Sequence, residues 1–188
     1  MRPPGLLLAC LALTAAACGG GSGTELGAGP PAPGFEFREE TAVEAGAPIA
    51  RRYTCDGADA SPALSWQGAP PGTLELALAF DDPEAPGGTF THWLVYELPS
   101  GATSIPAEVP REGAVEGPTP LEQGRGDSGD LGYRGPCPPA GETHTYVFRL
   151  LALDVELGLE PGADRAAFDD AVDGHVLAEA RLEATYGR

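Results

Sequence analysis

The 188-residue sequence contains neither lysine nor asparagine, and all eleven of its basic residues are arginines. Without lysine there is no Walker-type phosphate loop and no residue that can form a Schiff base. Without asparagine there is no N-glycosylation site and no Cys-His-Asn triad. The chain also lacks the Gly-x-Ser-x-Gly motif of serine hydrolases and the HExxH motif of zinc peptidases. Several classes of enzyme are therefore excluded.

Positive charge is scarce. The chain carries 28 acidic residues against its 11 arginines, which gives a formal net charge of -17. Proteins that bind nucleic acids normally present a basic face that displaces counterions from the phosphate backbone. We therefore expect no nucleic-acid partner.

Long helices are also disfavoured. Glycine and proline, with 27 and 20 residues, make up a quarter of the chain. Proline breaks helices, and glycine destabilises them. Because a chain of this length forms one ordinary domain, the composition predicts a single domain of strands joined by many turns.

The first 17 residues have the features of an export signal. Arg2 precedes an apolar run over residues 6–17, which is too short to span a bilayer and ends in three alanines before Cys18. Two cleavages fit: one by ordinary signal peptidase, and one before a lipid-modified Cys18, although Ala15 stands where lipoproteins usually carry a branched aliphatic residue. Residues 18–34 are rich in glycine and proline and predict a flexible tether, followed by a folded domain over residues 35–188.

Three cysteines remain after cleavage: Cys18, Cys55 and Cys137. Lipid modification of Cys18 would leave an even pair, which in an oxidising compartment usually forms a disulfide. Two separate buried thiols are the alternative. We expect an exported protein, either a lipoprotein of the cell envelope attached to the membrane through Cys18 or a periplasmic or secreted protein.

Alternation of apolar and small or polar residues predicts strands over residues 74–80, 91–97 and 145–153, with shorter candidates at 35–38, 49–53 and 63–66. One stretch, residues 165–172, is typical of a helix capped by Asp164, and a second helical piece is expected after Gly174. The chain ends in an alternating segment, 180–186. The segment between Pro99 and Pro139 has little regular pattern, and its length suggests a functional role.

Several short motifs occur in a characteristic order. They are Tyr53-Thr54-Cys55-Asp56-Gly57, Ser61-Pro62-Ala63-Leu64-Ser65-Trp66, Asp82-Pro83-Glu84-Ala85-Pro86, Thr91-His92-Trp93, Gly132-Tyr133, Gly135-Pro136-Cys137-Pro138 and His144-Thr145-Tyr146. Together they resemble the phosphatidylethanolamine-binding protein family, in particular its bacterial branch of Raf-kinase-inhibitor-like proteins. The resemblance extends from residue 35 to the C-terminus.

This resemblance implies a mainly β fold of packed antiparallel sheets with a few short peripheral helices. It also implies a small pocket for a phosphate-like anion or a phospholipid headgroup. The pocket residues carry over to Asp82, Glu84, His92, Gly135, Pro136, His144 and Tyr146. Imidazole and phenol groups can donate hydrogen bonds to a phosphate, with charge assistance when histidine is protonated. We expect binding without catalysis and without a cofactor, and relatives suggest a protein partner that the protein inhibits or modulates.

The sequence departs from the family pattern at two positions of these motifs. Glu84 replaces the second aspartate usual in the family, and Thr145 stands where many members carry arginine, so the preferred charge of the ligand is open. A metal-dependent hydrolase that uses Asp82, His92 and His144 as metal ligands is the alternative function, since two histidines and a carboxylate can hold zinc or iron.

Overall fold

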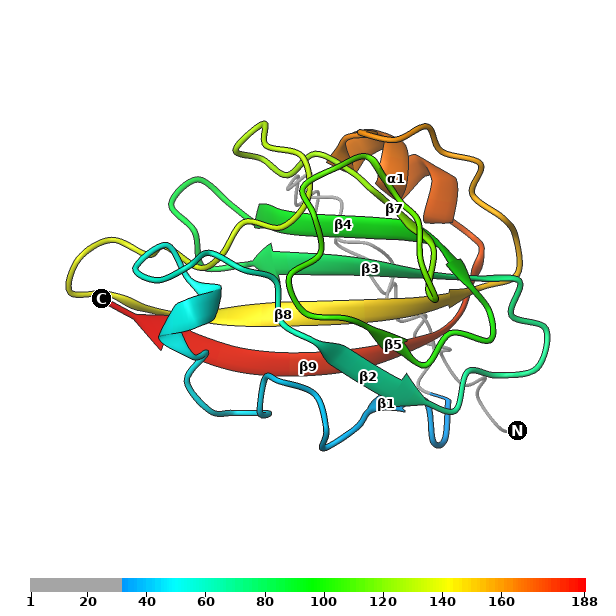
Figure 1. Ribbon diagram of the computed structural model, residues 1–188, viewed down its shortest axis with the longest axis horizontal. Helices are drawn as coiled ribbons and strands as arrows, with labels where there is room; N and C mark the ends of the chain where they lie inside the picture. Colours follow the sequence, from blue (N-terminus) through cyan, green and yellow to red (C-terminus); the bar gives the residue numbers. More distant parts are fainter. Residues whose placement is uncertain (1–31) are drawn as a thin grey trace, which may run out of the picture.

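The computed structural model describes residues 32–188, so the predicted export signal, Cys18 and most of the predicted tether lie outside the described residues. Two antiparallel sheets form the domain (Figure 1). The large sheet contains, in spatial order, β6 (Ala114–Val115), β7 (Leu121–Gln123), β4 (Phe90–Pro99), β3 (Glu75–Asp82), β8 (Thr143–Leu153) and β9 (Val176–Gly187). The small sheet contains β1 (Glu36–Phe37), β2 (Leu64–Gln67) and β5 (Ser104–Ile105), and the helices are η1 (Arg51–Tyr53), a 3-10 helix, and α1 (Arg165–Val172).

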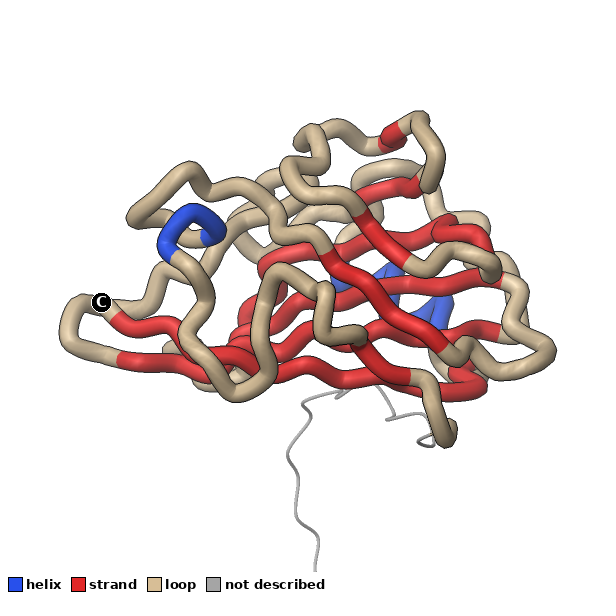
Figure 2. The backbone as a smooth tube through the Cα atoms, turned by 60° about the horizontal axis from the view of Figure 1, so that its bottom comes forward, coloured by secondary structure: helices blue, strands red, loops and turns tan. Residues whose placement is uncertain are grey.

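The large sheet is covered on both faces. The small sheet crosses one face, while α1 lies behind the other (Figure 2). The main core between the two sheets contains Trp66, Trp93 and Phe80, and a smaller core under α1 contains Ala77, Leu151 and Phe168, among others. Every residue of β3 is buried because this strand has protein on both sides. The expected mainly β fold is therefore confirmed.

The three long strands predicted from alternation are present, with small shifts at their ends. Two of the short predictions are wrong. A single bridge, Pro48 to Thr185, precedes residues 49–53. Residues 51–53 then form the helix η1, which ends where the Thr54 hydroxyl and amide both donate to the carbonyl of Arg51. Beyond Gly174 there is no second helix, because β9 begins at Val176 and pairs with β8 along almost its whole length.

The irregular middle segment is held by one buried side chain, Gln123. Its Oε1 accepts a hydrogen bond from Trp93 Nε1 at 2.7 Å, and its Nε2 donates to the carbonyls of Pro110 and Glu112, each at 2.7 Å. The side chain is fully buried. Since buried amides require all of these partners, Gln123 fixes two parts of the segment against β4.

The helix α1 begins as predicted. Asp164 Oδ1 accepts a hydrogen bond from the Ala167 amide at 3.0 Å, which satisfies one of the free N–H groups of the first turn. Arg165 then joins the helix to the large sheet through Asp81 Oδ1 at 2.6 Å and Thr91 Oγ1 at 2.8 Å. None of the helices in residues 32–188 is long and apolar enough to cross a bilayer.

Glu75, at the start of β3, is a carboxyl group buried at the opposite end of the sheet from the predicted site residues. It is 2% exposed, and its two oxygens accept hydrogen bonds from the amides of Glu97 and Leu157, both at 2.8 Å. Burial raises the pKa of Glu75 to about 7, against the effect of these two hydrogen bonds. The group therefore titrates close to neutral pH.

A raised carboxyl pKa means that the folded protein binds this proton more tightly than the unfolded chain does. Its contribution to stability is complete below the unfolded pKa of about 4.3 and is lost as the pH rises through about 7. We predict that the free energy of unfolding, measured in urea, decreases between pH 4 and 8 more in the wild type than in Glu75→Gln. The difference between the two decreases should be on the order of 1 to 3 kcal/mol. Glu39→Gln, at an exposed position, controls for the loss of one charge. Parallel pH profiles for wild type and Glu75→Gln would contradict the assignment.

Candidate functional site

The site is centred on a buried pair between Asp82, the last residue of β3, and His144, at the start of β8. Asp82 Oδ2 and His144 Nδ1 are 2.7 Å apart, and the two residues are 4% and 5% exposed. The antiparallel register that pairs Asp81 with Val147 brings the end of β3 beside the start of β8. Two residues that lie 62 positions apart in the chain therefore meet.

Tyr146 lies on the same face of β8 as His144, because side chains alternate along a strand. Its ring centroid is 6.4 Å from that of His144 and 5.4 Å from that of His92 on β4. The residue is completely buried, and its hydroxyl makes no hydrogen bond of normal geometry among the described residues, although it lies close to the Asp82 carboxylate and the Cys137 amide. Burial, and then the negative charge of Asp82, raise the pKa of Tyr146, so the hydroxyl keeps its proton. An unsatisfied buried donor of this kind points to a missing partner.

His92 is neutral in this structure. Its Nδ1 is 3.0 Å from the carbonyl oxygen of Arg134, and because a carbonyl only accepts, the proton sits on Nδ1. Burial lowers the pKa of His92 to about 4, although the bond to Arg134 opposes this shift. Near pH 7 its Nε2 therefore carries a lone pair and can accept a hydrogen bond. Charge assistance from a protonated imidazole is therefore not expected from His92 near neutral pH.

His144 has the opposite charge state. Besides Asp82 at Nδ1, a carboxylate oxygen of Glu142 lies 3.2 Å from Nε2. The bond to Asp82 is the main cause that raises the pKa of His144, and Glu142 adds to it against the effect of burial. Since ionised carboxylates only accept, both ring nitrogens carry protons and both are occupied. His144 therefore serves as an imidazolium held between two carboxylates.

Glu84 closes the edge of the site. Its carboxylate accepts a hydrogen bond from the Thr145 amide, which lowers the pKa of Glu84. Its own amide donates to Asp82 Oδ1 at 2.9 Å. The turn after β3 is thus tied both to the Asp82 carboxylate and to β8, and a negative charge is placed beside the pair.

Gly135 and Pro136 lie in the loop that supports His92 through Arg134. The Gly135 amide donates to Asp59 Oδ1 at 2.7 Å, and the carbonyl of Pro136 accepts from the Cys55 amide at 3.2 Å. A Cβ atom at Gly135 would lie 2.3 Å from the carbonyl oxygen of Tyr53, so only glycine fits there. Both main-chain groups are therefore hydrogen-bonded within the protein, and Gly135 and Pro136 form only a wall of the candidate site.

A disulfide joins Cys55 to Cys137 across a sequence separation of 82 residues, as the sequence analysis expected. It links this loop to the segment that follows η1. Closing so long a loop restricts the unfolded chain and stabilises the fold by about 4 kcal/mol in the chain-entropy model. The position of the wall beside Tyr146 and His92 is thus fixed covalently.

Sequence reasoning missed three contributors to the site. Glu142 lies two residues before His144, and its carboxylate contacts the His144 ring. Because residues two apart in a strand share a face, this spacing could have indicated the contact. Arg134 acts through its carbonyl and Asp59 through a contact distant in sequence, and neither role leaves a signal in the residue types.

Comparison with known proteins agrees with this geometry. Residues 39–187 match the family model described as phosphatidylethanolamine-binding protein. The chain belongs to the phosphatidylethanolamine-binding protein family. A relative named UPF0098 protein from Methanothermobacter thermautotrophicus is 50% identical over 140 residues, covering 74% of this chain and 91% of the relative. LppC of Mycobacterium tuberculosis, whose name describes it as a lipoprotein, is 37% identical over 200 residues, covering 96% of this chain and 94% of the relative.

Solved structures of the family show the same fold. A homologue of phosphatidylethanolamine-binding protein from Chlamydia trachomatis has a TM-score of 0.72 at 31% identity, covering 84% of this chain and 99% of that one. YbcL of E. coli, described as a member of the mammalian family, has a TM-score of 0.75 at 29% identity, covering 82% and 99%. The resemblance drawn from the motifs is therefore confirmed.

The metal-hydrolase alternative finds no support in the geometry. No group of three His, Cys, Asp or Glu residues within 32–188 is arranged to hold a metal ion. Three of the four ring nitrogens of His92 and His144 already bond to oxygens of the protein, namely those of Arg134, Asp82 and Glu142.

The two charge states can be checked by NMR titration of the imidazole signals. We expect His92 to remain neutral down to about pH 4 and His144 to titrate above its ordinary value of about 6.5. Asp82→Asn should lower the pKa of His144 more than Glu142→Gln does, because the Glu142 side chain is 56% exposed and its bond is longer. If His144 titrates at its ordinary pH in the wild type, the buried pair is not formed in solution.

Proposed function

We propose that this protein is a non-catalytic binding protein whose pocket, formed by Asp82, His92, His144 and Tyr146, takes a phosphate group carried by a small molecule or a lipid headgroup. The observation that carries the proposal is the Tyr146 hydroxyl, which is fully buried on a residue near two histidine rings and makes no hydrogen bond of normal geometry among the described residues. A bound phosphate oxygen would satisfy this donor. Membership of the family supports the same ligand chemistry.

The charges around the pocket restrict the ligand further. Asp82, Glu84 and Glu142 are three carboxylates, and the imidazolium of His144 is a single positive charge. A phosphate dianion would meet a net negative surrounding, and the neutral Nε2 of His92 would repel it as a second acceptor. A ligand that brings its own proton donor fits better. Either a protonated phosphate monoanion or a phosphate linked to an ammonium group, as in phosphorylethanolamine, supplies one.

Binding can be tested on the Tyr146 hydroxyl alone. We expect calorimetry at pH 7 to show that Tyr146→Phe weakens the affinity for phosphorylethanolamine about 10- to 100-fold, the usual worth of a hydrogen bond to a charged group. The free variant should be at least as stable as the wild type, because the change removes a buried hydroxyl that makes no hydrogen bond of normal geometry among the described residues. Inorganic phosphate, run in parallel, reports whether the ammonium group contributes.

Tyr96→Phe is the matched control. The Tyr96 hydroxyl lies on the other face of the sheet and donates to the carbonyl of Glu160 at 2.9 Å. Its loss should lower stability and leave ligand affinity unchanged, which is the reverse of the pattern for Tyr146. Equal affinity of wild type and Tyr146→Phe would exclude the site, and turnover of a phosphate ester by the wild type would show that the protein is an enzyme.

We further propose that the protein is an exported lipoprotein held in the cell envelope through Cys18. The apolar leader, the small residues before Cys18 and the glycine-rich segment after it support this location. So does the similarity over 96% of the chain to LppC, a relative with lipoprotein in its name. The tether would then place the binding domain near a membrane surface.

Replacing the lipid-accepting thiol tests the anchor. Cys18→Ser should move the protein from the membrane fraction to the soluble fraction, while the domain keeps its fold because residue 18 lies outside it. Cys10→Ser, within the leader, is the matched control and should leave the protein in the membrane fraction. An unmodified Cys18 at the mature N-terminus, read from the intact mass, would contradict lipidation.

A further inference from the structure

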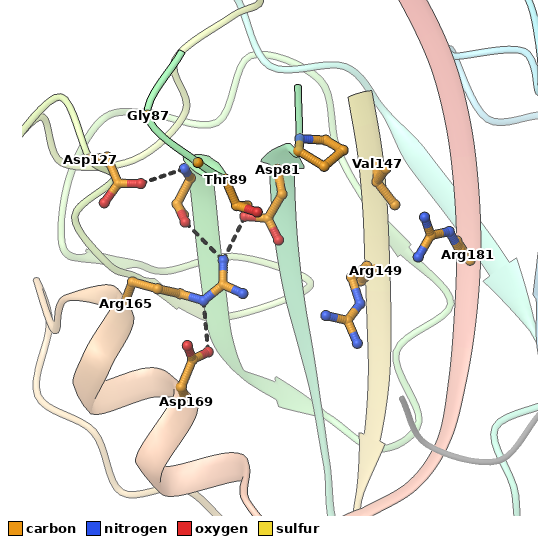
Figure 3. A pocket seen from close by; sticks show the side chains of 12 residues that line it. Asp81, Gly87, Thr89, Asp127, Val147, Arg149, Arg165, Asp169 and Arg181 are labelled. Carbon is orange, nitrogen blue, oxygen red and sulfur yellow. Dashed lines mark hydrogen bonds and ion pairs between the residues drawn. The ribbon is translucent and has the colours of Figure 1, made fainter. Parts of the chain in front are cut away.

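The outer face of the large sheet carries a second cleft, which the function proposed above does not use. Helix α1 covers only part of this face, packing on Ala77, Ala79 and Leu151. A cleft of about 350 Å³ lies beside the first turn of α1 (Figure 3). It is bounded by Arg165, the Gly87–Thr89 turn, Val147, Arg149 and Arg181. This volume lies within the range of small-molecule sites, about 300 to 1,000 Å³.

The cleft and the candidate site lie on opposite faces of the same strands. Consecutive side chains of a strand point to opposite faces. Asp82 and Tyr146 face the candidate site, whereas their neighbours Asp81 and Val147 line the cleft. A ligand in one place therefore does not touch the residues that form the other.

Two arginines meet across β8 and β9 at this cleft. Arg149 and Arg181 are directly opposite in the register of the two strands, an arrangement that like charges disfavour. Glu179 compensates Arg149 through two hydrogen bonds of 3.0 and 2.7 Å, in a pair that is 10% and 7% exposed. Arg181 is compensated much less well. Its recorded bond, from Nε to Glu183 at 2.7 Å, belongs to a pair that is 52% and 50% exposed, and such surface pairs are worth little.

Each acidic residue that lines the cleft already accepts a hydrogen bond from a guanidinium or an amide of the protein. Asp81 and Asp169 accept hydrogen bonds from Arg165 at 2.6 and 2.7 Å, and Asp127 accepts one from the Thr91 amide at 2.7 Å (Figure 3). A guanidinium carries five N–H donors in a planar fork. Arg181 uses one of them on a described residue, so its terminal nitrogens supply donors that the lining carboxylates do not use.

We propose that this cleft is a second binding site, for a small molecule with a carboxylate or phosphate group. The planar fork of Arg181 binds two oxygens of the group, as guanidinium groups do with both kinds of oxyanion. Arg165, fixed by its bonds to Asp81, Asp169 and Thr91, forms the opposite wall. Gly87 and Gly88, which have no side chains, leave the entrance open for the rest of the ligand.

The test uses the mature protein in two-dimensional amide NMR at pH 7, with succinate and inorganic phosphate as separate probes. We expect saturable shifts of the Gly87, Gly88 and Val147 amides with at least one probe. Arg181→Gln should weaken this binding at least 10-fold, and Arg181→Lys, which keeps the charge without the fork, should weaken it less. Which probe binds identifies the oxyanion.

Two controls separate this site from the candidate site. Arg38→Gln removes an arginine from a similarly exposed pair with the residue two positions later, Glu40, away from the cleft, and should bind as the wild type does. Tyr146→Phe should lose phosphorylethanolamine binding and keep the shifts at Gly87, Gly88 and Val147. The proposal is overturned if neither probe shifts these amides in a saturable way, or if Arg181→Gln binds as tightly as the wild type.

Discussion

The pairing of β3 with β8 in the middle of the large sheet is the constraint on which the other features depend. Both strands have protein on each face, so a shift of register by one residue would exchange two complete sets of buried side chains. The observed register places Phe80 opposite Phe148, with ring centroids 3.9 Å apart, in the core between the sheets. The same register carries Asp82 to His144 on one face and puts Asp81 beside Val147 on the other.

The two faces of the large sheet each bury a carboxylate, but the cation that is paired with it differs. In a chain with a net charge of -17, buried carboxylates need a cation or several N–H donors to stay ionised. On the inner face Asp82 is paired with the imidazolium of His144. On the outer face Asp81 is paired with Arg165, whose charge does not depend on pH in the physiological range. The cation of the inner pair can therefore lose its charge near neutral pH, whereas the cation of the outer pair cannot.

The loops that complete the inner site are held by groups outside it. The disulfide between Cys55 and Cys137 and the bond from Gly135 to Asp59 fix the wall, while Gln123 fixes the middle segment through Trp93. A chain rich in glycine loses much conformational entropy on ordering such loops. These long-range ties restrict the loops, so that Arg134 presents its carbonyl to His92 at a defined place.

The sequence alone determined the mainly β fold, because alternation in residues 74–80, 91–97 and 145–153 reports burial locally, and the helix at 165–172, because its cap lies within one turn. It also indicated Asp82, His92, His144 and Tyr146 as candidate site residues, because their motifs resemble those of the family. It failed at residues 49–53, where bonds from Thr54 to the carbonyl of Arg51 close a 3-10 helix, and after Gly174, where pairing with β8 decides the conformation. Only the tertiary structure decided that His92 is neutral and His144 charged. Two histidines of identical ordinary pKa differ because one is buried against a carbonyl and the other lies between two carboxylates, and these partners come from distant parts of the chain.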